Sequence, residues 1–204
     1  MRFTTKAASF ALALASSAAV AGAQQVMYNT AGMFSGCGVG STATSCVLNG
    51  GTGGTLNFIA SGNQSIFSPV FGATLGTFSL SGTAGNTYSL AGISFQLTIN
   101  QTMPTGGSAG LSSTLVGSFS QTPQGASGGP ITLTFANPNA AIGQVRYTVS
   151  TNPTNIRLPN LDGSANTTDL AANINVVPEP STYALMGAGL AGLVGMARRR
   201  RSIA

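Results

Sequence analysis

Residues 92–100, with the sequence GISFQLTIN, alternate between apolar and polar side chains. Successive side chains of a β-strand point to opposite faces, so this period of two places Ile93, Phe95 and Leu97 on one face and the polar residues on the other. The pattern predicts a half-buried strand. The same alternation recurs at 130–135, 144–150 and 170–176.

Glycine-rich segments separate these stretches, and shorter β-like runs lie between them. Many short strands joined by such segments, with no helical pattern in the body, predict an all-β fold: an antiparallel β-sandwich or jelly-roll-like domain over residues 24–177. A body of this length buries enough surface for one core without a metal or cofactor. The shorter strands are expected at 26–30, 55–60, 66–71, 77–80, 88–90 and 114–119, and the turns at 50–54, 82–86, 104–110, 123–130 and 137–139.

The first 23 residues have the three zones of a secretory signal peptide. Arg2 and Lys6 supply the positive start, an apolar stretch follows, and Ala21 and Ala23 flank a glycine at the small-residue cleavage site. We expect signal peptidase to cut before Gln24. The alternative is a short amphipathic or membrane helix, although an alanine-rich segment of this length holds a bilayer weakly.

Most of the charge lies at the ends of the chain. The formal net charge is +5, yet only Arg146, Arg157, Asp162 and Asp169 are charged between residues 24 and 177. Two positive and two negative residues leave the body neutral. Electrostatic attraction to phosphates dominates nucleic-acid binding, so the sequence predicts no nucleic-acid partner.

The cysteines agree with an exported protein. Cys37 and Cys46 are the only two in the chain and flank a loop of small residues. In an oxidising compartment such a pair predicts one local disulfide, and the alternative is two free, buried thiols. With no histidine and no further cysteine, the chain lacks the ligands of a zinc site.

Catalytic side chains are scarce. The body has no histidine and no glutamate, and its only carboxylates are Asp162 and Asp169. General acid–base and nucleophilic mechanisms need such groups in pairs around a substrate, and two aspartates in one predicted loop fit that geometry poorly. We therefore expect no enzymatic activity.

The same predicted loop, residues 161–169, carries several oxygen side chains. Ca²⁺ binds alternating oxygen ligands on a tight turn, but the glycine spacing and the glutamate of an EF-hand are missing. The sequence thus offers at most a weak calcium candidate, and the alternative is an Asx-type turn with no metal. The candidate ligands are Asp162, Ser164, Asn166 and Asp169.

The C-terminal segment 177–201, VPEPSTYALMGAGLAGLVGMARRRR, combines a Pro-Glu-Pro triplet, an apolar run and an arginine cluster. Residues 183–197 lack charge and would form a helix about 22 Å long, shorter than a hydrocarbon core of ~30 Å. Basic residues favour the cytoplasmic side of a membrane. The four that end this segment are Arg198, Arg199, Arg200 and Arg201.

In the order and spacing of these parts, residues 178–204 resemble the PEP-CTERM sorting signal of exported bacterial proteins. The resemblance implies a Gram-negative organism and processing by an exosortase, with Pro178, Glu179 and Pro180 as recognition residues. It also implies a short transmembrane sorting helix, transient inner-membrane anchoring held by the arginines, and release to the cell surface or extracellular matrix. The alternative is a membrane anchor that is never cut.

The body is rich in serine, threonine and asparagine, which replace charges as hydrated groups. Such neutral surfaces suit contact with exopolysaccharide, although serine and threonine are also ordinary polar residues of strands. We expect a non-catalytic surface or matrix protein associated with exopolysaccharide or a biofilm. The alternative is a secreted carbohydrate- or protein-binding module that is anchored at the cell surface.

Overall fold

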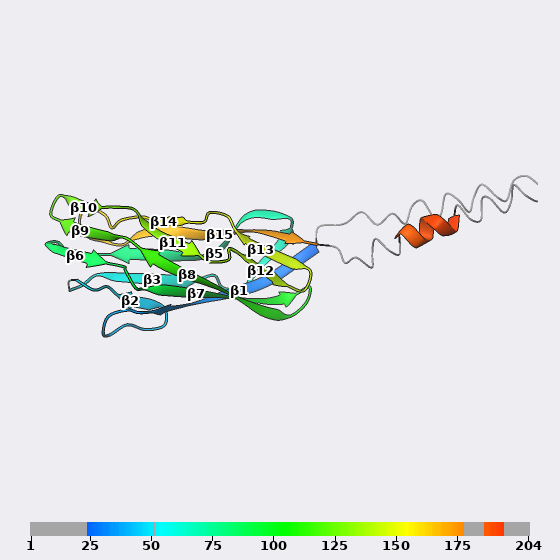
Figure 1. Cartoon of the computed structure of the whole chain (residues 1–204), viewed down its shortest axis with the longest axis horizontal. Helices are drawn as coiled ribbons and strands as arrows, with labels where there is room; N and C mark the ends of the chain where they lie inside the picture. Colours follow the sequence, from blue (N-terminus) through cyan, green and yellow to red (C-terminus); the bar gives the residue numbers. More distant parts are fainter. Residues whose placement is uncertain (1–23, 51, 178–185, 194–204) are drawn as a thin grey trace, which may run out of the picture.

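The computed structural model describes residues 24–50, 52–177 and 186–193. Fifteen strands make up the body, and every paired strand runs antiparallel to its neighbour. The body is elongated along these strands (Figure 1). The prediction of an all-β, antiparallel body is confirmed. Outside the body, residues 186–193 form a short, exposed helix.

The strands form two six-stranded sheets and one small sheet. Sheet A contains, in spatial order, β14 (Thr154–Ile156), β11 (Ile131–Phe135), β8 (Gly107–Val116), β7 (Ser94–Met103), β1 (Gln24–Ser35) and β4 (Gln64–Ser68). Sheet B contains β12 (Asn139–Ile142), β13 (Val145–Val149), β15 (Asn166–Val176), β5 (Val70–Ser81), β3 (Thr55–Ala60) and β2 (Ser45–Val47). Sheet C contains β10 (Gly125–Gly128), β9 (Ser118–Thr122) and β6 (Asn86–Ser89).

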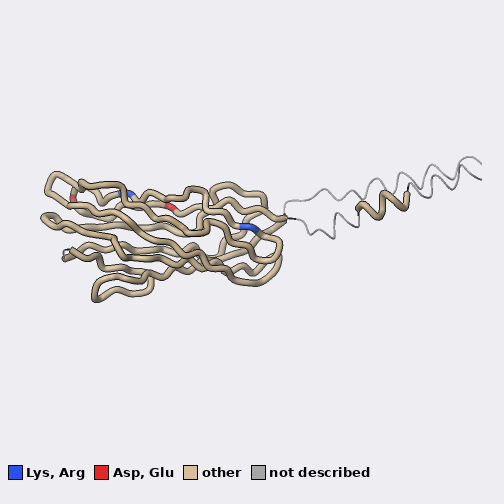
Figure 2. Tube along the Cα trace, viewed as in Figure 1, with Lys and Arg blue, Asp and Glu red and all other residues tan. Residues whose placement is uncertain are grey.

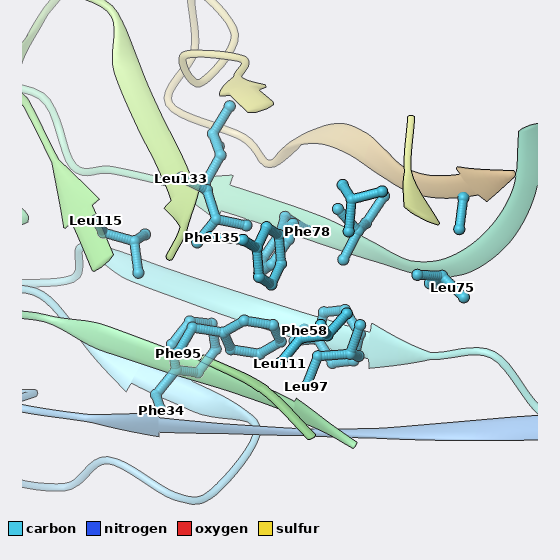
Figure 3. Close-up of a cluster of buried hydrophobic side chains, with 14 of the residues drawn as sticks. Phe34, Phe58, Leu75, Phe78, Phe95, Leu97, Leu111, Leu115, Leu133 and Phe135 are labelled. Carbon is cyan, nitrogen blue, oxygen red and sulfur yellow. The ribbon is translucent and has the colours of Figure 1, made fainter. Parts of the chain in front are cut away.

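Sheets A and B pack face to face over a core of aromatic and aliphatic side chains (Figure 3). Phe95 of β7 contacts Phe58 of β3 and Phe78 of β5, with ring centroids 4.8 and 5.0 Å apart. Phe34 of β1 lies 5.0 Å from Phe95. The alternating strand predicted at 92–100 thus buries its apolar face between the sheets, as the period of two requires.

Gly32 of β1 lies where these rings meet. A Cβ atom at this position would overlap the side chains of Phe58 and Phe95. The rings can therefore pack across β1 only because the residue has no side chain. Close approach of a neighbour to the backbone is a common reason for glycine inside a strand.

Buried polar groups also join the two sheets. The Tyr28 hydroxyl on β1 donates to the Thr74 carbonyl on β5 at 3.0 Å. Its ring packs edge-on against Tyr147 of β13, with centroids 5.8 Å apart. The Tyr147 hydroxyl donates in turn to Oε1 of Gln101 on β7 at 2.7 Å. Burial raises the pKa of Tyr28 to about 12, and it raises the pKa of Tyr147 as well.

The body begins and ends at the same end of the molecule (Figure 1). The first residue of β1, Gln24, pairs with Ser68 at the end of β4. Near the last residue of β15, the Val176 backbone N–H donates to the Ser68 hydroxyl at 2.9 Å. Ser68 therefore connects the start of β1 to the end of β15, and it does so across the two sheets.

Several predicted boundaries are wrong. Residues 66–71 are divided at Pro69, which has no backbone N–H to continue the pairing, so β4 ends and β5 begins there. Residues 114–119 are divided at Gly117, whose φ of 130° does not fit a strand. The turn predicted over 104–110 ends early because β8 begins at Gly107, opposite Gln101 of β7. The pattern missed β2, β10, β12 and β14.

Candidate functional site: a polar groove beside β15

A polar groove with a volume of about 450 Å³ lies between β14 and the first half of β15. Hydroxyl, amide and charged side chains predominate, and none of the lining residues is aromatic. The lining residues are Thr151, Thr154, Asn155, Arg157, Thr167, Thr168, Asp169 and Ala171.

The period of two in β15 turns its polar residues toward the groove. Leu170 and Ala172 are buried in the core, whereas Thr167 and Asp169, which have the opposite parity in the strand, are exposed. Strand β14 has the same division, since Ile156 is buried while its polar neighbours are exposed. The groove is therefore the solvent face of two strands whose other faces hold the core.

The groove exists because the pairing of β15 is one-sided over its first half. Strand β13 pairs with β15 only as far as Val149 opposite Ala172, and the Ser150 N–H then donates to the Ala171 carbonyl at 2.9 Å. Strand β14 comes near but pairs with β11 of sheet A. The described residues thus place no strand beside residues 166–171 on this side.

Two opposite charges line the groove. Oδ1 of Asp169 accepts a 2.7 Å hydrogen bond from the hydroxyl of Thr77 on β5, which orients the carboxylate. The Arg157 N–H donates to the Thr168 hydroxyl at 2.9 Å, which fixes the backbone at the end of β14. Between residues 24 and 177, charge is so sparse that this pair makes up half of it (Figure 2). The groove can both accept and donate charge-assisted hydrogen bonds.

The calcium candidates Asp162, Ser164, Asn166 and Asp169 all have hydrogen-bond partners within the protein. Oδ1 of Asp162 accepts the Ser164 N–H at 2.9 Å, which is an Asx turn. Hydrogen bonding from the Ser164 side chain, and then from its backbone N–H, lowers the pKa of Asp162. The Asn166 amide donates to the Leu158 carbonyl at 3.0 Å. Asp169 lies in β15 and not in a loop, so that part of the prediction is wrong. In the described ranges, no three His, Cys, Asp or Glu residues are grouped as metal ligands.

The predicted disulfide is present. Cys37 and Cys46 are bonded, with their Cα atoms 5.3 Å apart. Cys46 lies in β2 and is buried, so the bond attaches the loop after β1 to the edge of sheet B.

The processing signals lie mostly outside the described residues. Of the predicted cleavage site, Ala21 and Ala23 are outside and Gln24 is the first residue of β1. The sorting residues Pro178, Glu179 and Pro180 are also outside, as are Arg198, Arg199, Arg200 and Arg201. No helix within the described part of the chain has both the length and the hydropathy needed to cross a bilayer.

Sequence reasoning named Asp169 but not the groove. Residues 151–157 and residues 167–171 line the groove together, and neither segment carries a sequence motif that predicts this proximity. The one available signal was charge: Arg157 and Asp169 are two of only four charged residues in the body.

Comparison with known proteins identifies the C-terminal segment. A family model described as the PEP-CTERM protein-sorting motif matches residues 176–201. No curated protein and no solved structure matches the chain. The predicted resemblance, confined to the C-terminal end, is confirmed. The chain carries a PEP-CTERM sorting motif, which supports an exported protein that is handled at the membrane and processed by exosortase.

Proposed function

We propose that this protein is a non-catalytic β scaffold that is released outside the cell and retained there by neutral exopolysaccharide bound in the groove beside β15. The observation that carries this proposal is the position of Arg157 and Asp169 in one hydroxyl-rich groove of an otherwise almost uncharged body.

The chemistry of the groove suits sugar hydroxyl groups. A carboxylate accepts hydrogen bonds from hydroxyls, and a guanidinium donates to their oxygens, so Asp169 and Arg157 complement both roles of a sugar hydroxyl. Thr167 and Thr168 add neutral partners. Because no aromatic ring lines the groove for stacking, each contact is weak. A polymer with many repeats offers many equivalent sites, so a protein that leaves one repeat can bind again at a neighbouring one.

The route to the matrix follows from the two terminal segments. In this proposal signal peptidase removes residues 1–23, the apolar run at 183–197 stops briefly in the inner membrane, and exosortase cuts near the Pro-Glu-Pro triplet. The match of the sorting motif to residues 176–201 supports the exosortase step.

Charge-matched variants test the sugar site. The double variant Arg157→Gln with Asp169→Asn removes the groove charges, and Arg146→Gln with Asp162→Asn removes the other two charges of the body. The secreted proteins are run through gels containing the exopolysaccharide of the producing strain. We expect the groove variant to lose most of its retardation and the control to keep it. Equal retardation of both variants would refute a sugar site in the groove.

A second candidate function is binding of a partner protein by strand addition. The edge of β15 over residues 166–171 has no neighbouring strand among the described residues, and an extended peptide can pair with such an edge. Thr167→Pro would remove one backbone N–H from this strand, an N–H that donates to Oδ1 of Asn166 at 2.9 Å while the edge is unoccupied. Loss of a discrete protein from pull-downs with Thr167→Pro, together with unchanged gel retardation, would favour this function over the first.

A further inference from the structure

Large apolar side chains are exposed where the body meets the sorting segment. Phe67 is 61% exposed and Phe71 78%, and both are far more accessible than the core phenylalanines. Met103 and Val177 are also exposed, at 42% and 50%. We call these four residues the tail-end patch. Exposed phenylalanines that lie next to the sorting segment are typical of a surface that contacts another molecule or a membrane.

The strand pairing brings the patch together. Phe67 pairs with Gln25 at the start of β1, and Ser68 beside it accepts the Val176 N–H. Phe71 follows Val70, which pairs with Ile174 near the end of β15. Met103 lies opposite Met27, at the end of β7. These pairings place Phe67, Phe71 and Met103 at the end of the body where Val177 leaves it.

The chain between the body and the apolar run is short. Residues 178–182 separate Val177 from Tyr183, and five residues span at most about 18 Å when fully extended. The polar headgroup layer of one leaflet is roughly 5–8 Å thick. Once the apolar run has entered a bilayer, this end of the body therefore lies at the lipid surface or at most about 10–13 Å from it.

The charge at this end fits an anionic lipid surface. Arg146 of β13 is exposed and pairs with Asn175, close to Val177. Asp169 is six residues further along β15, about 20 Å away at the rise of a strand. Among the described residues, the charge nearest to the patch is thus positive, which favours anionic headgroups; Glu179 of the sorting segment, two residues beyond Val177, is the one nearby carboxylate in the sequence.

We propose that the tail-end patch rests on the outer surface of the inner membrane while the sorting segment is anchored, with Phe67 and Phe71 inserted among the headgroups and acyl-chain ends. This inference depends on the membrane stage of the proposed function. The contact holds the Pro-Glu-Pro triplet at the lipid surface, where an integral-membrane enzyme can reach it. When the tail is removed, the patch alone binds weakly and the body leaves.

The chain contains no tryptophan, so one substitution creates a unique fluorescent reporter. Phe71→Trp places the reporter in the patch. Val39→Trp is the matched control, because Val39 is fully exposed beyond the far end of β1, a strand of 12 residues and about 40 Å. Each full-length variant is reconstituted into vesicles of phosphatidylethanolamine and phosphatidylglycerol, with and without brominated acyl chains.

We expect the Phe71→Trp emission to shift to shorter wavelength and to be quenched several-fold more by brominated lipid than the Val39→Trp emission. Adding Phe67→Ser to Phe71→Trp should reduce this quenching. Water-like emission from both reporters would overturn the inference, and so would emission shielded by a second copy of the chain without bromine quenching. Retardation in polysaccharide gels depends on Arg157 and Asp169 and is measured on the released protein, so failure of the sugar site leaves this result intact.

Discussion

The hydroxyl of Tyr147 on β13 and the amide oxygen of Gln101 on β7 are 2.7 Å apart and form a buried hydrogen bond between the two large sheets. The Gln101 amide nitrogen donates to the Thr105 carbonyl at 2.7 Å, so both ends of the side chain are bonded. Together with the bond from the Tyr28 hydroxyl to the Thr74 carbonyl, the bond from Tyr147 to Gln101 joins sheet A to sheet B through buried polar groups.

Replacing Gln101 by methionine should therefore destabilise the fold by about 1–3 kcal/mol, because the Tyr147 hydroxyl keeps its burial and loses its acceptor. In the double variant with Tyr147→Phe the unsatisfied hydroxyl is gone, so the combined loss should be smaller than the sum of the single losses. Urea denaturation of the four proteins measures this coupling. Strict additivity would show that the two side chains do not interact.

Stability should fall at alkaline pH. The pKa of Tyr28 is about 12 in the folded protein because of burial, against an ordinary value of 10.0. The unfolded chain therefore releases this proton at lower pH than the folded one. The free energy of unfolding should hold steady below about pH 10 and decrease from there toward pH 12. Denaturation curves at a series of pH values test this, and Tyr28→Phe should flatten the decrease; an equally steep fall in that variant would assign the effect to other groups.

Gly32→Ala should destabilise the body by about 1–3 kcal/mol, because the new methyl group overlaps the rings of Phe58 and Phe95. Gly110→Ala is the matched control in an exposed part of β8, where the added Cβ meets its nearest neighbour at an ordinary 3.5 Å. It should change stability by less than about 0.5 kcal/mol. Thermal unfolding followed by circular dichroism compares the two variants, and equal melting temperatures would contradict the packing at Gly32.

Removing the disulfide should cost about 2–3 kcal/mol, the value expected for a loop closed by residues nine positions apart. The variant Cys37→Ser with Cys46→Ser should still fold, because the aromatic core lies between other strands. Its unfolding midpoint should match that of the natural chain in reducing buffer. A midpoint equal to that of the oxidised chain would show that the bond adds no stability.

The predictable part of the fold was the part with a strong period of two. The strand at 92–100 was evident because bulky apolar residues alternate with polar ones, and those residues form the core. Strands β10 and β12 were missed since GASG and NAAI have small side chains and little contrast between their faces. Their strand character comes from pairing with β9 and β13, which a local pattern does not contain.

The same limit applies to the functional regions. The sorting segment is a contiguous motif and was evident from its order of residues. The groove and the tail-end patch are assembled from distant segments: Arg157 and Asp169 are brought together by strand packing, and Phe67 is placed beside the exit of the chain by Ser68. Only the register of the strands reveals these neighbours.

The position of Gln24 and Val176 at one end of the body has a consequence for maturation. Both residues belong to strands whose pairings lie entirely between residues 24 and 177, so peptide bonds can be cut on either side of the body without removing a single partner from a sheet. A reporter or affinity handle fused at either terminus would emerge from that one end and leave the groove beside β15 accessible.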